Sequence, residues 1–133
     1  MKRAITIFLL GFVFTVSSCN KDEERTTILG SWNCEEITEI GGIVTYQISI
    51  TRNHYAPNDS NSYLINNFHN IGNSPSLEVI VEEIEIGKLE IAHSPIGFDF
   101  EGNGTIASDF SKIDWQYKVN DGINNPLVIS TYY

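Results

Sequence analysis

The side chains that most often carry metal or acid–base chemistry are scattered along this chain. The three histidines, His54, His69 and His93, are too far apart for the H-x-H or H-x-x-x-H spacing that brings two imidazoles to one metal ion. Each lies beside residues typical of a turn, so we expect all three to be exposed. The G-x-S-x-G pattern of a serine nucleophile is also missing. We therefore expect no metal site, no catalytic residues and no cofactor, and we do not expect an enzyme.

Residues 99–104 match the first half of a calcium-binding loop only in part. Such a loop places oxygen ligands at alternate positions, turns at a glycine and ends on a bidentate glutamate. Here the third position is Glu101, and Phe110 stands where the final glutamate is required. Asn103-Gly104 is also a common tight-turn pair. We expect a strand that ends in a hairpin turn with exposed acidic residues, rather than a calcium site.

Five glutamates lie between residues 78 and 90, and two carboxylates on either side of a sugar are the machinery of a glycoside hydrolase. Glu78 and Glu82, however, alternate with Val79 and Val81. In a strand, these two glutamates share the face opposite the valines. The pattern therefore favours an acidic face in solvent over a catalytic pair.

The two cysteines are expected to have different roles. Cys19 follows a basic start, Lys2-Arg3, and an apolar run over residues 4–16. The run is shorter than the roughly 20 apolar residues that span a bilayer, so it is typical of a secretion signal. Cys34 then has no partner for an intramolecular disulfide in the mature chain, and we expect it to be a small buried residue in a strand.

Val16-Ser17-Ser18-Cys19 resembles the lipobox that the signal peptidase of bacterial lipoproteins recognises. The resemblance implies that residues 1–18 are removed, that the Cys19 thiol carries a diacylglycerol, and that the new amino terminus often receives an acyl chain such as palmitate. Several acyl chains hold a protein firmly, because each buried methylene contributes ~0.8 kcal/mol. The alternative is an ordinary secretion signal in which the cysteine occurs by chance.

Residues 20–24 (NKDEE) resemble the lysine-plus-acidic export signal of surface lipoproteins from the Bacteroidetes. The resemblance implies an outer-membrane lipoprotein exposed on the cell surface. The alternative is a plain charged tether on a protein that faces the periplasm. Under both interpretations, residues 19–27 form a lipidated tether.

Residues 28–133 have the length of a single domain, and we expect one hydrophobic core. The chain carries a formal net charge of −9 at pH 7. Such acidity opposes contact with phosphate backbones, so a nucleic-acid partner is not expected.

Alternation of apolar and polar residues dominates this domain and predicts an all-β fold. The most regular strands are expected at residues 44–51 and 113–119. Further strands are expected at 28–40, 62–68, 77–86, 89–91, 98–100 and 127–133. Hairpin turns are predicted at Gly41-Gly42, Asn103-Gly104 and Asp121-Gly122, and a long loop over residues 53–61.

About eight antiparallel strands with short connections favour a meander that closes into a small barrel, since closure removes exposed strand edges. A two-sheet β-sandwich is the alternative. Gly30-Ser31-Trp32 resembles the Gly-x-Trp with which lipocalin-like barrels begin, where the tryptophan packs over the closed end. No Thr-Asp-Tyr motif is present, and no arginine after Arg52 is available to cover the tryptophan. With the lipid anchor, the plan resembles the small lipocalin-like lipoproteins of the Bacteroidetes.

Five aromatic residues fall on the apolar phase of their strands and are candidate ligand contacts. They either line a cavity or fill one, and in so small a barrel we favour filling, because bulky rings from opposing strands meet readily. The candidates are Tyr46, Phe98, Phe100, Trp115 and Tyr117.

Two functions are consistent with the sequence. The first is a surface-tethered, non-catalytic binding module for a small apolar ligand or a glycan. The second is a structural or accessory lipoprotein that contacts an outer-membrane protein through its acidic surface. In both cases the membrane is reached through the lipid on Cys19.

Overall fold

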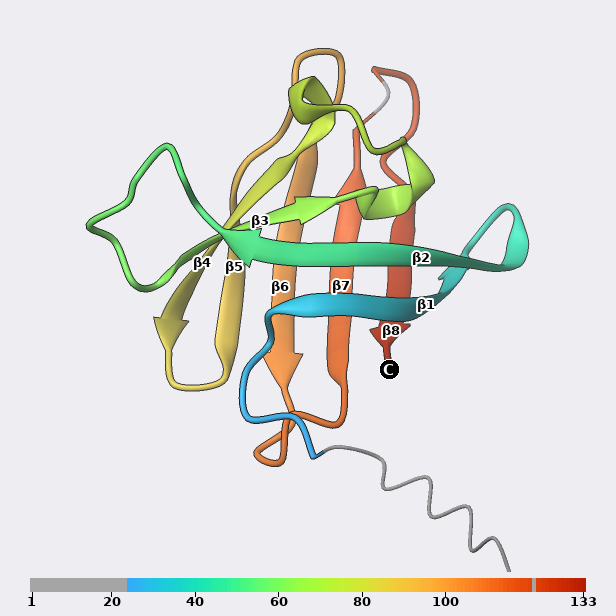
Figure 1. The fold of residues 1–133 in the computed structure, drawn as a ribbon. Helices are drawn as coiled ribbons and strands as arrows, with labels where there is room; N and C mark the ends of the chain where they lie inside the picture. Colours follow the sequence, from blue (N-terminus) through green and yellow to red (C-terminus); the bar gives the residue numbers. More distant parts are fainter. Residues whose placement is uncertain (1–23, 121) are drawn as a thin grey trace, which may run out of the picture.

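The computed structural model describes residues 24–120 and 122–133, which form a barrel of eight antiparallel strands (Figure 1). Consecutive strands are neighbours, and β8 pairs with β1 to close the ring. The predicted all-β meander is confirmed, in the closed form rather than as a sandwich. The strands are β1 (Gly30–Thr38), β2 (Gly42–Arg52), β3 (Ser62–Asn66), β4 (Val79–Glu85), β5 (Lys88–His93), β6 (Phe100–Ile106), β7 (Ile113–Val119) and β8 (Leu127–Tyr132).

No helix in the described part of the chain is long and apolar enough to cross a bilayer.

The predicted hairpin turn at Asn103-Gly104 is wrong. Both residues lie inside β6, where Asn103 pairs with Gln116 of β7 and Gly104 pairs with Trp115. A Cβ at position 104 would lie 2.9 Å from the Trp115 ring. Glycine stands here because the indole occupies the space of a side chain, and not because the backbone turns.

Other boundaries also differ from the sequence prediction, and two of them have a clear cause in the backbone. The turn between β1 and β2 comprises residues 39–41, and Gly42, at φ +75°, already belongs to β2. The third strand ends at Asn66 rather than at residue 68, because Asn67 takes a left-handed conformation with φ 60°.

Side chains fill the barrel interior. Trp32, Trp115, Tyr117, Tyr132 and Phe68 are among the largest fully buried side chains. The Phe68 ring, from the connection after β3, lies 5.7 Å from the ring of Trp115 and 4.7 Å from that of Tyr117. Trp115 in turn lies 6.0 Å from Tyr132. The prediction that Trp115 lies inside is confirmed, and so is the expectation that the strand aromatics fill the space between opposing strands.

One end of the barrel is closed by Trp32. Its indole nitrogen donates to the carbonyl of Ile28 at 2.8 Å, and the guanidinium of Arg25 lies over its ring at 3.9 Å. Arg25 also donates to the carbonyl of Ser31 at 2.6 Å. No arginine after Arg52 is available for this role, yet the tryptophan is covered. The arginine comes from the segment before β1, and not from a later strand.

The opposite end, which we call the mouth, is surrounded by four connections: β1–β2, β3–β4, β5–β6 and β7–β8 (Figure 1). The β3–β4 connection holds two short 3-10 helices, η1 (Phe68–Asn70) and η2 (Pro75–Leu77). Phe98 lies in the β5–β6 connection and is 37% exposed, so its predicted place on the inner face of a strand is wrong. The chain is still turning at Phe98, and only Phe100, the first residue of β6, is buried.

Candidate functional site

A carboxylate lies inside the barrel on β1. The inward face of this strand carries Trp32, Cys34 and Glu36, and Glu36 is only 3% exposed. An ionised group buried without partners would cost several kcal/mol. The residues that contact Glu36 therefore decide whether its charge is tolerated.

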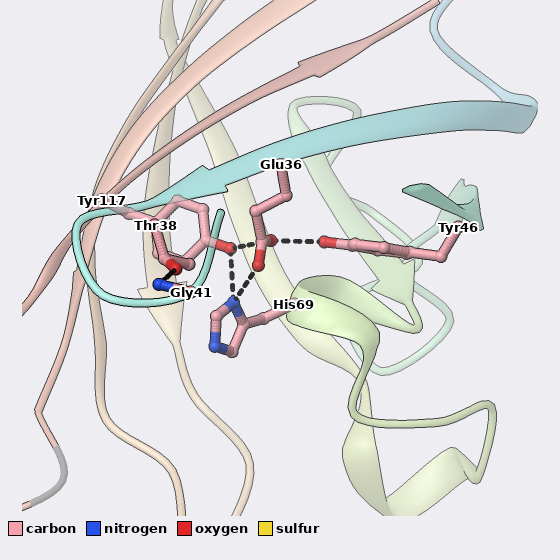
Figure 2. A network of polar contacts seen from close by, with 6 residues as sticks. All are labelled: Glu36, Thr38, Gly41, Tyr46, His69 and Tyr117. Carbon is pink, nitrogen blue, oxygen red and sulfur yellow. Dashed lines mark hydrogen bonds and ion pairs between the residues drawn. The ribbon is translucent and has the colours of Figure 1, made fainter. Parts of the chain in front are cut away.

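Three side chains from different elements converge on Glu36 (Figure 2). The hydroxyls of Tyr46 on β2 and Tyr117 on β7 both donate to Oε2, each at 2.6 Å. The Nδ1 atom of His69, in η1, lies 2.9 Å from Oε1. The carboxylate thus has a partner on each oxygen, and the network joins four segments that are distant in the sequence.

The hydrogen-bond pattern fixes the orientation of the His69 ring. Its Nδ1 lies 2.9 Å from the Tyr117 hydroxyl as well as 2.9 Å from Glu36. Because the Tyr117 proton is directed at Glu36, and an ionised carboxylate only accepts, Nδ1 carries the proton in these contacts. The second nitrogen, Nε2, points away from Glu36 (Figure 2). The His69 side chain is 23% exposed, so the imidazole reaches solvent.

The electrostatics of the network favour an ionised Glu36 and protonated tyrosines. Burial opposes ionisation of Glu36, but the hydrogen bonds from His69, Tyr117 and Tyr46 together outweigh it and hold its pKa below the usual 4.5. Burial raises the pKa of both tyrosines well above the usual 10, and the charge of Glu36 raises that of Tyr117 further. Both phenols therefore remain donors at physiological pH.

The segment that presents His69 has an unusual backbone. Asn67, His69 and Asn70 all have positive φ, at 60°, 53° and 56°. Asparagine and histidine tolerate this conformation better than most residues, yet it still costs free energy. The Asn67 side chain offsets part of the cost, because it donates to the carbonyl of Gln47 and accepts from the amide of Gly72, both at 2.8 Å.

Four of the five predicted aromatic contacts lie around this network. Tyr46 and Tyr117 belong to it, and Phe100 lies 5.7 Å from the His69 ring. Phe98 stacks on Phe100 with ring centroids 5.7 Å apart. Trp115 is not part of the cluster, since its ring packs against Phe68 and Tyr132.

Glu36 and His69 are the two central residues that the sequence analysis missed. Glu36 did carry a signal, because it continues the inward phase of Trp32 and Cys34 on an alternating strand. His69 carried none, since only the left-handed turn of η1 directs it inward. The expectation of three exposed histidines is confirmed for His54 and His93 and is wrong for His69.

Cys34 is fully buried beside this network, as predicted. Burial raises the pKa of its thiol to about 11, against the lowering effect of a hydrogen bond with Tyr46. Because the thiolate is the reactive form, Cys34 is a packing residue rather than a nucleophile.

The acidic candidates do not form a metal site. In residues 24–120 and 122–133, no group of three or more His, Cys, Asp or Glu side chains is arranged to hold a metal ion. Asp99, which opens the calcium-like segment, instead accepts a hydrogen bond from the Asn120 side chain at 3.1 Å. Glu82 is exposed and faces Glu90 across β4 and β5, in agreement with a solvated acidic face.

Cys19 and the export-like segment at residues 20–23 lie outside the described residues. No family model matches the chain, and no curated protein is significantly similar to it. The functional proposal therefore depends on the residues at the mouth.

Proposed function

We propose that this chain is a lipid-anchored, non-catalytic binding module that takes a small ligand at the mouth of its barrel. Cys19 carries the lipid, and His69 is the side chain that contacts the ligand. Glu36, Tyr46 and Tyr117 position His69 from inside. The protein acts outside the cytoplasm, on the cell surface.

The observation that carries the proposal is the buried carboxylate behind a partly exposed imidazole. Replacing a buried ion pair by apolar residues of similar size often leaves stability unchanged or increases it. The chain instead keeps Glu36 inside and holds His69 on a left-handed backbone, and such locally unfavourable features gather at functional sites. A polar group fixed in orientation at the open end of a barrel is what recognition of a small ligand requires.

The chemistry of the mouth indicates the kind of ligand. His69 offers one polar contact through Nε2. The exposed ring of Phe98, stacked on the buried ring of Phe100, offers an apolar surface beside it. Below them, Phe68 and Tyr117 occupy the interior. We therefore expect a small, mainly apolar molecule with one polar end, which lies across the mouth and does not enter the barrel.

The position of the tether supports this use of the mouth. The described chain begins at the closed end, where Arg25 covers Trp32. Glu24 follows Cys19 by five residues, which reach at most roughly 18 Å. The 11 residues of β2 form a strand about 36 Å long, which runs obliquely from the closed end to the mouth (Figure 1). A lipid on Cys19 thus keeps the closed end near the membrane and leaves the mouth free to meet a ligand.

Nuclear magnetic resonance titration tests this proposal. A library of small amphiphilic compounds is added to the labelled protein, and we expect shifts grouped at His69, Phe98 and Phe100. Glu36→Gln should weaken the same compounds, because it removes the charge that orients the imidazole. Glu35→Gln, an exposed neighbour, is the matched control. Compounds that shift only residues outside the mouth, or that bind Glu36→Gln unchanged, would contradict the proposal.

One observation favours the second function, an accessory lipoprotein with a protein partner. Ile37 on β1 pairs with Ile43 on one side and Ile129 on the other, so the three form a row on the outer wall. They are 46%, 66% and 50% exposed, and an apolar row in solvent is typical of a contact surface. A partner that co-purifies from detergent-solubilised membranes and is lost with Ile37→Glu would establish this role. If the partner co-purified equally well with the Ile37→Glu variant, this row of isoleucines would not be its binding surface.

A further inference from the structure

A groove runs along the outer wall of the barrel over β6 and β7. It consists of two hollows of about 410 Å³ and about 310 Å³. Asn103 and Gln116 line both hollows, so the two are continuous. The groove lies outside the barrel. Tyr117 of the network around Glu36 is among its lining residues, but the Tyr117 side chain is buried and its hydroxyl donates to Glu36 inside the barrel.

The groove is lined by cross-strand pairs of polar residues. Along β6 and β7, Glu101 faces Lys118, Asn103 faces Gln116 and Thr105 faces Asp114. All six side chains are on the exposed face of their strands. The four-residue step from Glu101 to Thr105 corresponds to about 14 Å of extended strand. The groove therefore offers a ladder of carboxylate, amine, amide and hydroxyl groups with the length of a short linear molecule.

The central amide pair is open to a ligand. Within the described residues, the side chains of Asn103 and Gln116 have no hydrogen-bond partner, and both are exposed. A second amide pair on the outer wall, Asn33 with Gln47, provides a contrast. There, the Gln47 side chain donates to Asn33 at 3.3 Å, so the two amides are engaged with each other.

One border of the groove is apolar. Leu127 and Ile129 of β8 line it beside the polar ladder, and Ile129 is 50% exposed. On the other border, Glu90 is the last β5 residue paired with β6. The groove thus presents one apolar edge next to donors and acceptors in alternation.

This combination fits one class of ligand. A peptide strand would need a long free strand edge, but β6 is paired with β7 along the whole groove. On its other edge β6 is paired with β5 up to Asn103, and the Phe100 backbone is bound to the Ser94 hydroxyl, so only Glu101 and Gly102 remain unpaired there. A polyanion would meet Glu90, Glu101 and Asp114 with only Lys118 beside them. A neutral chain of sugars suits both features, because its hydroxyls both donate and accept while its C–H faces pack against apolar side chains.

From this geometry we infer that the groove over β6 and β7 binds a neutral, linear oligosaccharide. Asn103 and Gln116 make the central hydrogen bonds, and Ile129 contacts the apolar face of a sugar ring. This site is separate from the mouth and does not depend on the function proposed there.

Calorimetric titration of the full-length protein in detergent tests the inference. The probes are four neutral hexasaccharides: cellohexaose, maltohexaose, xylohexaose and mannohexaose. We expect at least one of them to bind. Loss of two hydrogen bonds in Asn103→Ala/Gln116→Ala should weaken that binding by about tenfold or more. The matched control, Asn33→Ala/Gln47→Ala, removes the same groups elsewhere on the wall and should leave the affinity unchanged.

A third variant separates the groove from the mouth. His69→Ala should leave hexasaccharide binding unchanged, because His69 does not line the groove. The inference is overturned if none of the four probes binds, if both amide double variants weaken binding equally, or if His69→Ala abolishes it. Equal thermal melts of the two double variants exclude unfolding as the cause of a difference.

Discussion

Glu36 shows how one polar residue can dictate the arrangement of its neighbours. Its carboxylate is buried, so each oxygen must be satisfied, and the two phenols and one imidazole that do so come from β2, β7 and η1. The same contacts keep the carboxylate ionised and aim the His69 ring. The residue is therefore expected to affect stability and ligand binding together.

The first prediction concerns the pH dependence of stability in Glu36→Gln. The folded pKa of Glu36 is below 4.5, so its contribution to stability is fully present above about pH 4.5 and is lost as the pH falls through the lowered pKa. We expect Glu36→Gln to be less stable than the wild type by about 2 kcal/mol near pH 7, and the difference to shrink toward pH 3. Urea melts of the wild type and of Glu36→Gln at several pH values measure this difference in the free energy of unfolding.

Glu35→Gln is the control for this series, since Glu35 is exposed on the outer face of the same strand. It should cost little at any pH. A wild-type advantage over Glu36→Gln that stays constant from pH 7 to pH 3 would mean that Glu36 is not ionised in the folded protein.

Trp115 gives the second prediction at this scale. It is 1% exposed and contacts Phe68 and Tyr132, so Trp115→Ala leaves a cavity and should cost about 3 to 5 kcal/mol. Asp114→Ala, on the opposite face of β7, should cost at most about 1 kcal/mol, because its contacts with Lys112 and Thr131 are exposed. Denaturant melts measure the free energy of unfolding of both variants. If Asp114→Ala were the less stable of the two, the placement of Trp115 on the inner face of β7 and of Asp114 on its outer face would be contradicted.

At the scale of elements, β6 depends on its glycines. Gly104 pairs with Trp115, and the indole lies directly over it, while Gly102 has the backbone of β7 where a side chain would be. Glycine at these two positions therefore leaves room for the side chain and backbone of β7. Asn103, between the two glycines, pairs with Gln116, so the two side chains are neighbours on the outer wall.

Gly104→Ala is the third prediction. A Cβ at this position would lie 2.9 Å from the Trp115 ring, so either the indole or the strand must move. We expect a loss of about 1 to 3 kcal/mol in the free energy of unfolding. Thr105→Ala, the exposed neighbour, should be close to neutral. Chemical denaturation of the two variants provides the comparison, and an undisturbed Gly104→Ala protein would show that the indole can shift at no cost.

At the scale of the whole molecule, the barrel has two different ends. The closed end receives the chain from its tether and is covered by Arg25 and Trp32. The mouth carries His69 and the exposed ring of Phe98. In the function proposed above, the closed end is the end that is attached and the mouth is the end that meets the ligand.

Cys19→Ala tests the anchor, as the fourth prediction. Without the thiol no diacylglycerol can be attached, so the protein should either leave the membrane fraction or remain as an unprocessed precursor. Fractionation and immunoblotting distinguish these outcomes from the wild type. A processed variant that still partitions with the membrane would contradict the lipoprotein proposal.

The fifth prediction concerns the location of the protein in the cell. Replacing Lys21, Asp22 and Glu23 by alanine should leave lipidation intact and reduce digestion by protease added to whole cells. Equal digestion of the variant and the parent would leave residues 20–24 as a plain linker.

The sequence by itself determined the all-β meander and favoured its closure into a barrel, with a two-sheet sandwich as the alternative. The alternation in β2 and β7 requires one face of each strand to be buried, and antiparallel strands with short connections can bury those faces by closing on themselves. The same rule placed Trp115 and Cys34 inside, because a strand's period of two is a local property that needs no knowledge of its neighbours.

Only the tertiary structure decided the site. The network joins Glu36 to His69 and Tyr117, which are separated from it by 33 and 81 positions in the chain. Closure of the barrel brings β1 near β7, and the left-handed turn of η1 directs His69 inward. Neither the approach of β1 to β7 nor the inward direction of His69 can be seen in a local stretch of the sequence. A buried carboxylate is tolerated only where hydrogen-bond donors surround it, and here those donors come from distant parts of the chain.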